Sequence, residues 1–312
     1  MPPLSNHITW QSISIPATSA FGSVDLMIGE VGQAHPRVLI TAGIHGDEGP
    51  WGAWAIHKVL NRIQMDELKG SIRVIPVTNP LAMQADKRNA PVDQLDLNRA
   101  FPGDARGSYT ERIAHVLAND GLANVDTVID LHGGGSWCVN SFVFQSEGGA
   151  DLALSFPAPF IVNAPSWSVT LTGYARSKGL SVVGVEMGGR SQFESQWADK
   201  IADGLFRALV KIGIVDPVTP PVDVARPIPV KPSTVLRPAI GGIFVPTIDA
   251  SQVGTIVPEG TLLGMMVHPA THAVLEEFRA PFPKTAVMLL RPFVAQLEGG
   301  AMTYVLSEPV EA

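Results

Sequence analysis

Cysteine is almost absent from the sequence, which contains a single such residue, Cys138, in 312. One cysteine cannot form a disulfide within the chain, and it excludes zinc modules built from several thiolates. The first residues, MPPLSNHITW, contain no basic segment followed by an apolar one, so we expect no signal peptide and a cytoplasmic protein. No run of about 18 apolar residues that could span a bilayer is present either, so no membrane partner is expected.

Charged residues are also scarce, at 16% of the chain, and the formal net charge is −7. No cluster of Lys or Arg interrupts this balance, which argues against nucleic acid as a partner, because phosphate binding requires clustered cations. Hydrophobic residues make up 46%, which is typical of a packed globular protein rather than a disordered one. An anionic substrate would therefore have to be bound by a few local arginines.

Apolar periodicity in the first two thirds of the chain predicts alternating strands and helices. Residues 8–32 alternate as two strands joined by SAFGS (19–23), which predicts a hairpin at the edge of a sheet. Later apolar runs predict buried strands, and apolar stripes at helical spacing predict helices. This alternation predicts an α/β fold with a sheet covered on both faces. The predicted strands are 37–42, 71–78, 125–131 and 181–185, and the predicted helices start near Pro50 and Trp197.

Proline and glycine mark the organisation of the rest. Residues 216–232 contain six prolines, which predicts an extended linker. Short β-type runs punctuated by glycine and proline follow it. We therefore expect a first, α/β domain over 1–215 and a small β domain over 233–312. Within the first domain, residues 79–103 show neither the helical nor the strand periodicity of apolar residues. A loop of this length in a compact domain is usually functional.

Three predicted strands end in polar residues flanked by glycine. His45 and Glu48 lie in GIHGDEG, His132 lies in DLHGGG and Glu186 lies in VEMGG. Ligands of open α/β sheets bind beyond the carboxyl ends of the strands, so these side chains are expected to meet. Two imidazoles and one carboxylate form a ligand set for catalytic zinc. The alternative for an isolated HxxE is a capping glutamate and a surface histidine, which the glycines and the second histidine disfavour.

Two further acids lie near this predicted metal site. Glu186 is a candidate general acid and base that moves a proton from water to a leaving amine, and its alternative role is that of an ordinary strand-terminal acid. Asp130 precedes His132 by two residues and so shares its face of the strand. It is either a hydrogen-bond partner of a metal-binding imidazole or a plain strand-end acid.

The long loop carries Arg88, and Asn98-Arg99 directly before Ala-Phe-Pro-Gly. A solvated charged face is the simplest interpretation of such a loop. However, arginine binds carboxylates through two parallel hydrogen bonds, which lysine cannot reproduce. One arginine could also polarise the carbonyl of a scissile amide.

Taken together, GIHGDEGP, KRNAPVDQLDLNRAFPG, DLHGGG and VEMGG resemble, in this order and spacing, the succinylglutamate desuccinylase/aspartoacylase family. That family is itself similar to the zinc carboxypeptidases. The resemblance covers the motifs between about residues 37 and 213 and extends over the β-rich tail. It implies a carboxypeptidase-like mixed sheet flanked by helices, followed by a small barrel-sandwich-like β domain, and it is compatible with a homo-oligomer. The tail looks like a lipoyl/biotinyl barrel but lacks a Met-Lys-Met attachment tip.

The resemblance also implies a role for each matched residue. His45, Glu48 and His132 would bind one Zn²⁺ per chain, and Glu186 would be the catalytic glutamate. Three loop residues are matched as well: Arg88 would polarise the carbonyl, and Asn98 and Arg99 would bind the substrate's carboxylate. Arg176 has no matched role, so selectivity for succinyl or aspartyl groups is not implied. The motif variants look more like the bacterial branch that includes deacetylases of N-acetyl-diaminobutyrate-like compounds.

We therefore expect a zinc-dependent amidohydrolase that deacylates a small N-acyl amino acid, or a related compound, bearing a carboxylate. One alternative keeps the chemistry and changes the substrate: an M14-type metallocarboxypeptidase acting on short peptides. A domain that narrows the mouth of the cleft would disfavour it. The second alternative is a non-catalytic binding protein that retains the metal, against which Glu186 argues.

Overall fold

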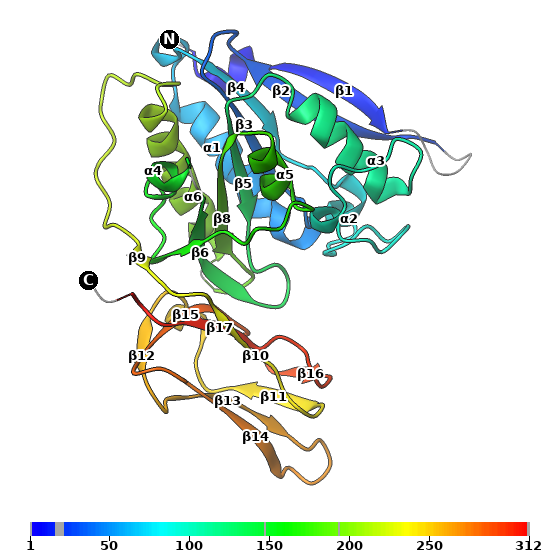
Figure 1. Cartoon of the computed structure of the whole chain (residues 1–312), viewed down its shortest axis with the longest axis vertical. Helices are drawn as coiled ribbons and strands as arrows, with labels where there is room; N and C mark the ends of the chain where they lie inside the picture. The colour runs from blue at the N-terminus through cyan, green and yellow to red at the C-terminus, as the bar shows by residue number, and fades with distance from the viewer. Residues whose placement is uncertain (1, 16–21, 147, 193, 311–312) are drawn as a thin grey trace.

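The computed structural model describes residues 2–15, 22–146, 148–192 and 194–310. Most of the chain forms a long mixed sheet with helices on both faces, and a β-rich unit follows at the C-terminal end (Figure 1). None of the helices in the described residues combines the length and the apolar character needed to cross a bilayer. The predicted fold class, an α/β sheet followed by a smaller all-β part, is confirmed.

Four parallel strands form the centre of the large sheet, in the order β4-β3-β5-β8. Every residue of β4 and β5 is buried, as expected for strands covered on both faces. On one side β6 continues the sheet antiparallel to β8, and β7 pairs with β6. The strands of this region are β3 (Arg37–Ala42), β4 (Ser71–Ile75), β5 (Thr127–His132), β6 (Val139–Gln145), β7 (Phe160–Asn163) and β8 (Ser181–Gly188).

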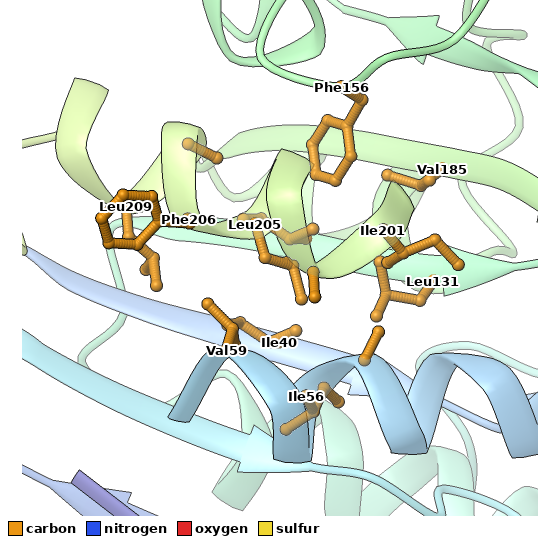
Figure 2. Packing of buried hydrophobic residues seen from close by; sticks show 14 of the residues in the cluster. Ile40, Ile56, Val59, Leu131, Phe156, Val185, Ile201, Leu205, Phe206 and Leu209 are labelled. Carbon is orange, nitrogen blue, oxygen red and sulfur yellow. The ribbon is translucent and has the colours of Figure 1, made fainter. Parts of the chain in front are cut away.

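Alternate side chains of the central strands enter two different cores. Ile40 and Leu131 belong to a core that packs against α1, α4 and α6 (Figure 2). Leu39, one residue from Ile40, and Val128, three residues from Leu131, belong to the core beneath α2, α3 and α5. This alternation is what places helices on both faces of the sheet. The helices are α1 (Gly49–Arg62), α2 (Pro80–Gln84), α3 (Tyr109–Val116), α4 (Ala150–Ala153), α5 (Leu171–Ser177) and α6 (Glu194–Lys211).

The predicted N-terminal hairpin is present at one edge of the sheet. Strands β1 (Thr9–Ile15) and β2 (Val24–Val31) pair antiparallel, and β1 ends the strand order. Of the predicted connection SAFGS, residues 19–21 lie outside the described residues.

The C-terminal unit is joined to the large sheet by strand pairing. β15 pairs with β6 through Leu289–Asn140 and Leu290–Val139, and β17 and β10 continue the sheet beyond it. A second sheet, ordered β14-β13-β11-β16, packs on these strands, and Tyr304 donates a hydrogen bond to the carbonyl of Leu263 between them. The domain limits predicted from the sequence stay a prediction. The strands from residue 228 onward are β9 (Ile228–Pro229), β10 (Thr234–Leu236), β11 (Gly242–Pro246), β12 (Ile256–Pro258), β13 (Leu262–Val267), β14 (Val274–Arg279), β15 (Lys284–Leu290), β16 (Ala295–Leu297) and β17 (Tyr304–Ser307).

The segment 79–103 differs from its prediction in one respect. It was expected to lack regular structure, but it contains the short helix α2 and the 3-10 turn η4 (Leu97–Arg99). Asn79 caps α2 by accepting a hydrogen bond from the backbone of Ala82, and Pro80 suits the first helical turn. A helix of five residues is too short to produce an apolar stripe, which explains why periodicity did not reveal it.

Candidate active site

The carboxyl ends of three adjacent parallel strands bring the predicted site residues together. β3 leads into the turn η2 (Gly46–Glu48), which His45 precedes directly. β5 ends at His132, and Glu186 lies opposite it in register on the neighbouring strand β8. The sheet edge therefore fixes the distance between a histidine and an acid that are far apart in sequence.

A close contact between two segments positions the loop 79–103 against the turn η2. A Cβ atom at Gly46 would lie 2.0 Å from the carbonyl carbon of Ala82, so only glycine lets this turn approach α2. The backbone N–H groups of Gly46 and Asp47 donate to the carbonyls of Arg88 and Lys87, at 3.4 and 3.2 Å. These contacts hold the long loop 79–103 against the turn that carries Glu48.

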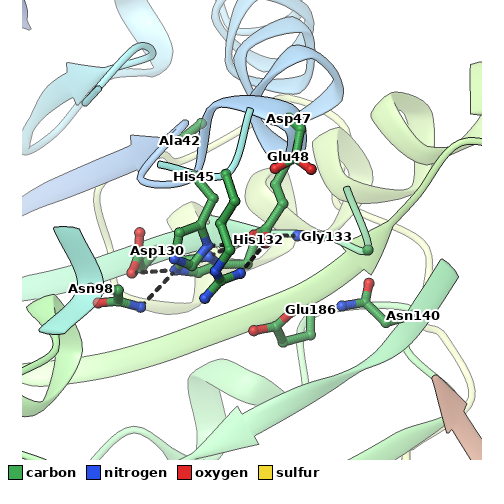
Figure 3. A network of polar contacts seen from close by, with 12 residues as sticks. Ala42, His45, Asp47, Glu48, Asn98, Asp130, His132, Gly133, Asn140 and Glu186 are labelled. Carbon is green, nitrogen blue, oxygen red and sulfur yellow. Dashed lines mark hydrogen bonds and ion pairs between the residues drawn. The ribbon is translucent and has the colours of Figure 1, made fainter. Parts of the chain in front are cut away.

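His45, Glu48 and His132 form a compact buried group whose potential ligand atoms all lie within 4.8 Å of one another. Glu48 lies between the imidazoles, with Oε1 3.0 Å from Nδ1 of His45 and Oε2 3.0 Å from Nδ1 of His132 (Figure 3). Although Glu48 Oε1 lies 3.0 Å away, this contact does not have hydrogen-bond geometry, so within the described residues the buried Nδ1 of His45 has no hydrogen-bond partner. Such an atom costs free energy unless something else satisfies it. The three residues could hold a metal ion.

Each imidazole is held on its other side by a carboxylate. Asp96 Oδ1 lies 3.0 Å from Nε2 of His45, and Asp130 Oδ2 lies 2.9 Å from Nε2 of His132. The hydroxyl of Thr41 donates to the second oxygen of Asp130 at 2.6 Å. A carboxylate in this position fixes the tautomer and orientation of a metal-binding imidazole. The contact of Asp130 is the one that its spacing from His132 indicated, whereas Asp96 had been given no role.

Arg88 links two of these carboxylates. Its Nη1 donates to Glu48 and its Nη2 donates to Asp96, each at 3.0 Å. Burial opposes ionisation of Asp96, but the hydrogen bond and charge of His45 and the charge of Arg88 outweigh it and hold the pKa of that carboxyl well below its usual range. The pKa of Glu48 is lowered against burial in the same way, by His45 and His132. Both carboxylates are therefore anionic at neutral pH.

The carboxylates have the opposite effect on the histidines. Burial alone would lower the pKa of His132, but Asp130 and Glu48 raise it well above its usual value. For His45, Glu48 and Asp96 outweigh burial and also raise the pKa. Protons held by these imidazoles are the protons that a bound cation would displace.

Glu186 faces the same cavity from β8. Asn140 of β6 donates a hydrogen bond from Nδ2 to its Oε2 at 2.6 Å. Burial raises the pKa of Glu186 to about 7, and the charge of Glu48 adds to this rise while that of His132 opposes it. A carboxyl with such a pKa can both accept and return a proton near neutral pH.

Asn98 and Arg99 lie beside the histidines on η4. The side-chain carbonyl of Asn98 accepts from the backbone N–H of Leu171 at 3.0 Å, and its Nδ2 lies 3.4 Å from Nε2 of His132. The guanidinium of Arg99 lies over the ring of Trp167, 4.7 Å from its centre. Both side chains therefore have a fixed support on the neighbouring segment.

A single cavity of about 450 Å³ brings these groups together, and all seven residues singled out by sequence line it. Arg176, which had no matched role, also lines the cavity and donates to the carbonyl of Pro165 at 3.0 Å. Other lining residues were not found from the sequence, because β6 and the C-terminal unit carry no local motif. Among them are Asn140, Phe142, Phe144, Leu289, Met302 and Val305.

Comparison with known proteins gives consistent matches over more than nine tenths of the chain. A curated N-alpha-acetyl-L-2,4-diaminobutyric acid deacetylase from Halomonas elongata is 27% identical over 313 aligned positions, which cover 94% of this chain and 89% of the relative. A succinylglutamate desuccinylase/aspartoacylase structure from Rhodobacter sphaeroides superposes with a TM-score of 0.82 at 26% identity and covers 96% of both chains. The product-bound ectoine utilization protein EutE from Ruegeria pomeroyi has the same fold, with a TM-score of 0.83 at 24% identity over 96% of this chain and 94% of that one.

Residues 34–212, more than half of the 312, match the succinylglutamate desuccinylase/aspartoacylase catalytic domain. The matched segment contains all seven residues singled out by sequence and the whole parallel centre of the sheet. The chain therefore belongs to the succinylglutamate desuccinylase/aspartoacylase family.

Proposed function

We propose that this protein is a zinc-dependent deacylase that hydrolyses the amide bond of a small N-acyl amino acid or a related compound. The observation that carries the proposal is the convergence of a buried His-Glu-His group and Glu186 on one cavity. The activity named for the Halomonas relative, deacetylation of an N-acetylated amino acid, supports the same reaction class.

The donor set suits zinc. Two imidazole nitrogens and one carboxylate are the ligands of many catalytic zinc sites, which leave a further position open. The buried Nδ1 of His45 without a hydrogen-bond partner, and the carboxylates behind both imidazoles, fit this assignment. When bound, zinc would supply a Lewis acid that polarises a carbonyl and makes water acidic enough to lose a proton near neutral pH.

The protein's own groups would perform the remaining tasks. Glu186 would accept a proton from the attacking water on Oε1 or Oε2 and return it to the nitrogen of the departing amine. Asn140 would hold the carboxylate in place from Nδ2. Arg88 uses two N–H groups for Glu48 and Asp96, which leaves others to donate to the oxygen of the scissile carbonyl.

Carboxylate recognition would fall to Asn98 and Arg99. Arg99 presents a planar guanidinium stacked on Trp167, and the Nδ2 of Asn98 is oriented by the hydrogen bond between its Oδ1 and Leu171. Leu289, Met302 and Val305 of the C-terminal unit line the cavity, which supports small substrates rather than peptides.

Amine release tests the proposal. Zinc-loaded protein would be incubated with N-acetyl, N-succinyl and N-aspartyl amino acids and with short peptides, and Glu186→Ala would serve as the control. We expect release from one or more acylated amino acids and none with the variant. Cleavage confined to peptides would instead identify a metallocarboxypeptidase, and no release from any compound by metal-replete protein would favour a binding protein.

A further inference from the structure

The residues that line the active-site cavity form two chemically different groups. The cations Arg88, Arg99 and Arg176 and the polar Asn98 come from the loop 79–103 and from α5. The second group is apolar and comes from β6, from the residue Trp137 shortly before it and from the C-terminal unit. Its residues are Trp137, Phe142, Phe144, Leu289, Met302 and Val305, and we call them the apolar wall.

The pleat of the sheet explains how this wall forms. Phe142 is paired in register with Glu186, so both side chains stand side by side on the same face of β6 and β8. Phe144 follows on that face, with its ring over Gly184, where a Cβ atom would lie 3.3 Å from Cδ2 of the ring. The rings of Phe142 and Phe144 pack edge to face with their centres 5.2 Å apart.

The pairing of β6 with β15 brings the C-terminal unit into the wall. Leu289 is paired with Asn140, the residue that holds Glu186, and is 8% exposed. Val305 of β17 packs in the same cluster, with Met302 against it. This unit therefore provides part of the substrate site as well as a cover for the sheet edge.

The carboxylates that line the cavity already have partners. Glu48 contacts both histidines and Arg88, Asp130 contacts His132 and Thr41, and Glu186 accepts from Asn140. No other carboxylate among the described residues lines the cavity. An ammonium group on the side chain of the substrate would therefore meet three arginines and no carboxylate that is free of a partner, and its desolvation would be unfavourable.

We propose that the substrate carries an uncharged apolar group, which the apolar wall receives while Asn98 and Arg99 bind the carboxylate. This inference rests on the proposed deacylase function and adds the substrate class to it. The apolar group belongs either to the acyl chain or to the side chain of the amino acid. The C-terminal unit thereby contributes to selectivity through Leu289, Met302 and Val305.

Two substrate series separate these sources. In the first, the acyl group of an N-acyl glycine is lengthened from acetyl to butyryl to hexanoyl. In the second, acetyl is kept and the amino acid is glycine, alanine, valine, leucine or phenylalanine, with N-acetylaspartate and N-acetyl-2,4-diaminobutyrate as charged comparisons. We expect kcat/KM to rise in one series by about 4-fold per buried methylene, and to be lowest for the diaminobutyrate compound.

Variants of the wall supply matched controls. Met302→Gln keeps the length of the side chain but makes it polar, and it should abolish most of the rise of kcat/KM along the favoured series. Met27→Gln, at an exposed methionine outside the cavity, should leave the rise intact. Phe144→Ala opens space over Gly184 and should shift the preference toward longer groups, a gain that misfolding cannot produce.

Faster turnover of the charged compounds than of any apolar one would overturn this inference and leave the deacylase function standing. The inference is also overturned if kcat/KM does not change along either series, or if Met302→Gln leaves the rise of kcat/KM unchanged. Amine release from none of the compounds would overturn the deacylase function itself, and the inference with it.

Discussion

His132 and Glu186 occupy paired positions on the adjacent parallel strands β5 and β8. A candidate metal ligand and the candidate proton carrier are therefore held by backbone hydrogen bonds of the sheet rather than by a loop. Sites built on strands keep their geometry more accurately than sites on loops. This relationship implies that single side-chain changes in the site can be interpreted without large movements of the backbone.

The first prediction concerns the pH dependence of the reaction. Glu186 must be ionised to accept a proton, and burial raises its pKa to about 7. We therefore expect kcat/KM to decrease as the pH falls through about 7, because protonated Glu186 cannot act as a base. Asn140→Asp would place a second carboxylate beside Glu186 in place of a hydrogen-bond donor and should move this limb to higher pH. The measurement is kcat/KM against pH for both proteins, and an unchanged limb in the variant would show that another group controls it.

The second prediction concerns the ligand set. Glu48→Gln retains the shape of the side chain but removes the charge that lies between two imidazoles. We expect the bound zinc to fall well below one ion per chain. Glu259→Gln, at an exposed glutamate in the C-terminal unit, should bind as much zinc as the unchanged protein. The zinc content of each variant is measured after gel filtration. One zinc ion per chain in Glu48→Gln would show that Glu48 is not a zinc ligand.

The third prediction follows from the histidines. Their pKa values are raised in the metal-free protein because anionic carboxylates surround them. Zinc requires neutral imidazoles, so its binding must release protons, and its affinity should increase as the pH rises. Calorimetric titration with zinc at pH 7, in buffers of different ionisation enthalpy, gives the number of protons released. A value of zero would mean that the imidazoles are already neutral.

The fourth prediction concerns carboxylate binding. Arg99→Gln should raise KM by roughly 10- to 100-fold for a substrate with a free carboxylate, the range expected for a charge-assisted hydrogen bond. It should have little effect on the corresponding substrate amide, which is turned over poorly by either protein. Arg106→Gln, at an exposed arginine of the same region, is the matched control. Equal effects of both variants would indicate a general influence of positive charge.

Much of the site could be predicted from the sequence because its parts are local motifs. His45 and Glu48 lie three residues apart, and the glycines around them and around His132 mark the strand ends. The neighbouring carboxyl ends of parallel strands then required these residues to meet. In the same way, the buried runs of β3 and β5 could be placed to within a few residues.

The contacts that escaped prediction connect segments far apart in the chain. Asn140 reaches Glu186 only because β6 inserts antiparallel beside β8, and Met302 reaches the cavity only because β15 pairs with β6. The apolar periodicity of a strand does not indicate which other strand it pairs with, so neither pairing could be predicted. Asp96 offered a weak signal, since it lies two residues before Asn98 and caps its turn, but its bond to His45 depends on how the loop folds back.

The most direct test is a zinc titration of metal-free protein with amine release measured at each step, carried out in parallel on Glu186→Gln. Activity on the best N-acyl amino acid should rise linearly and reach its plateau at one zinc per chain. The variant should bind the same amount of zinc but release amine at least about 100-fold more slowly, the loss expected for a missing general base. Activity that is independent of zinc, or a fully active Glu186→Gln, would contradict a metal-dependent deacylase in which Glu186 carries the proton.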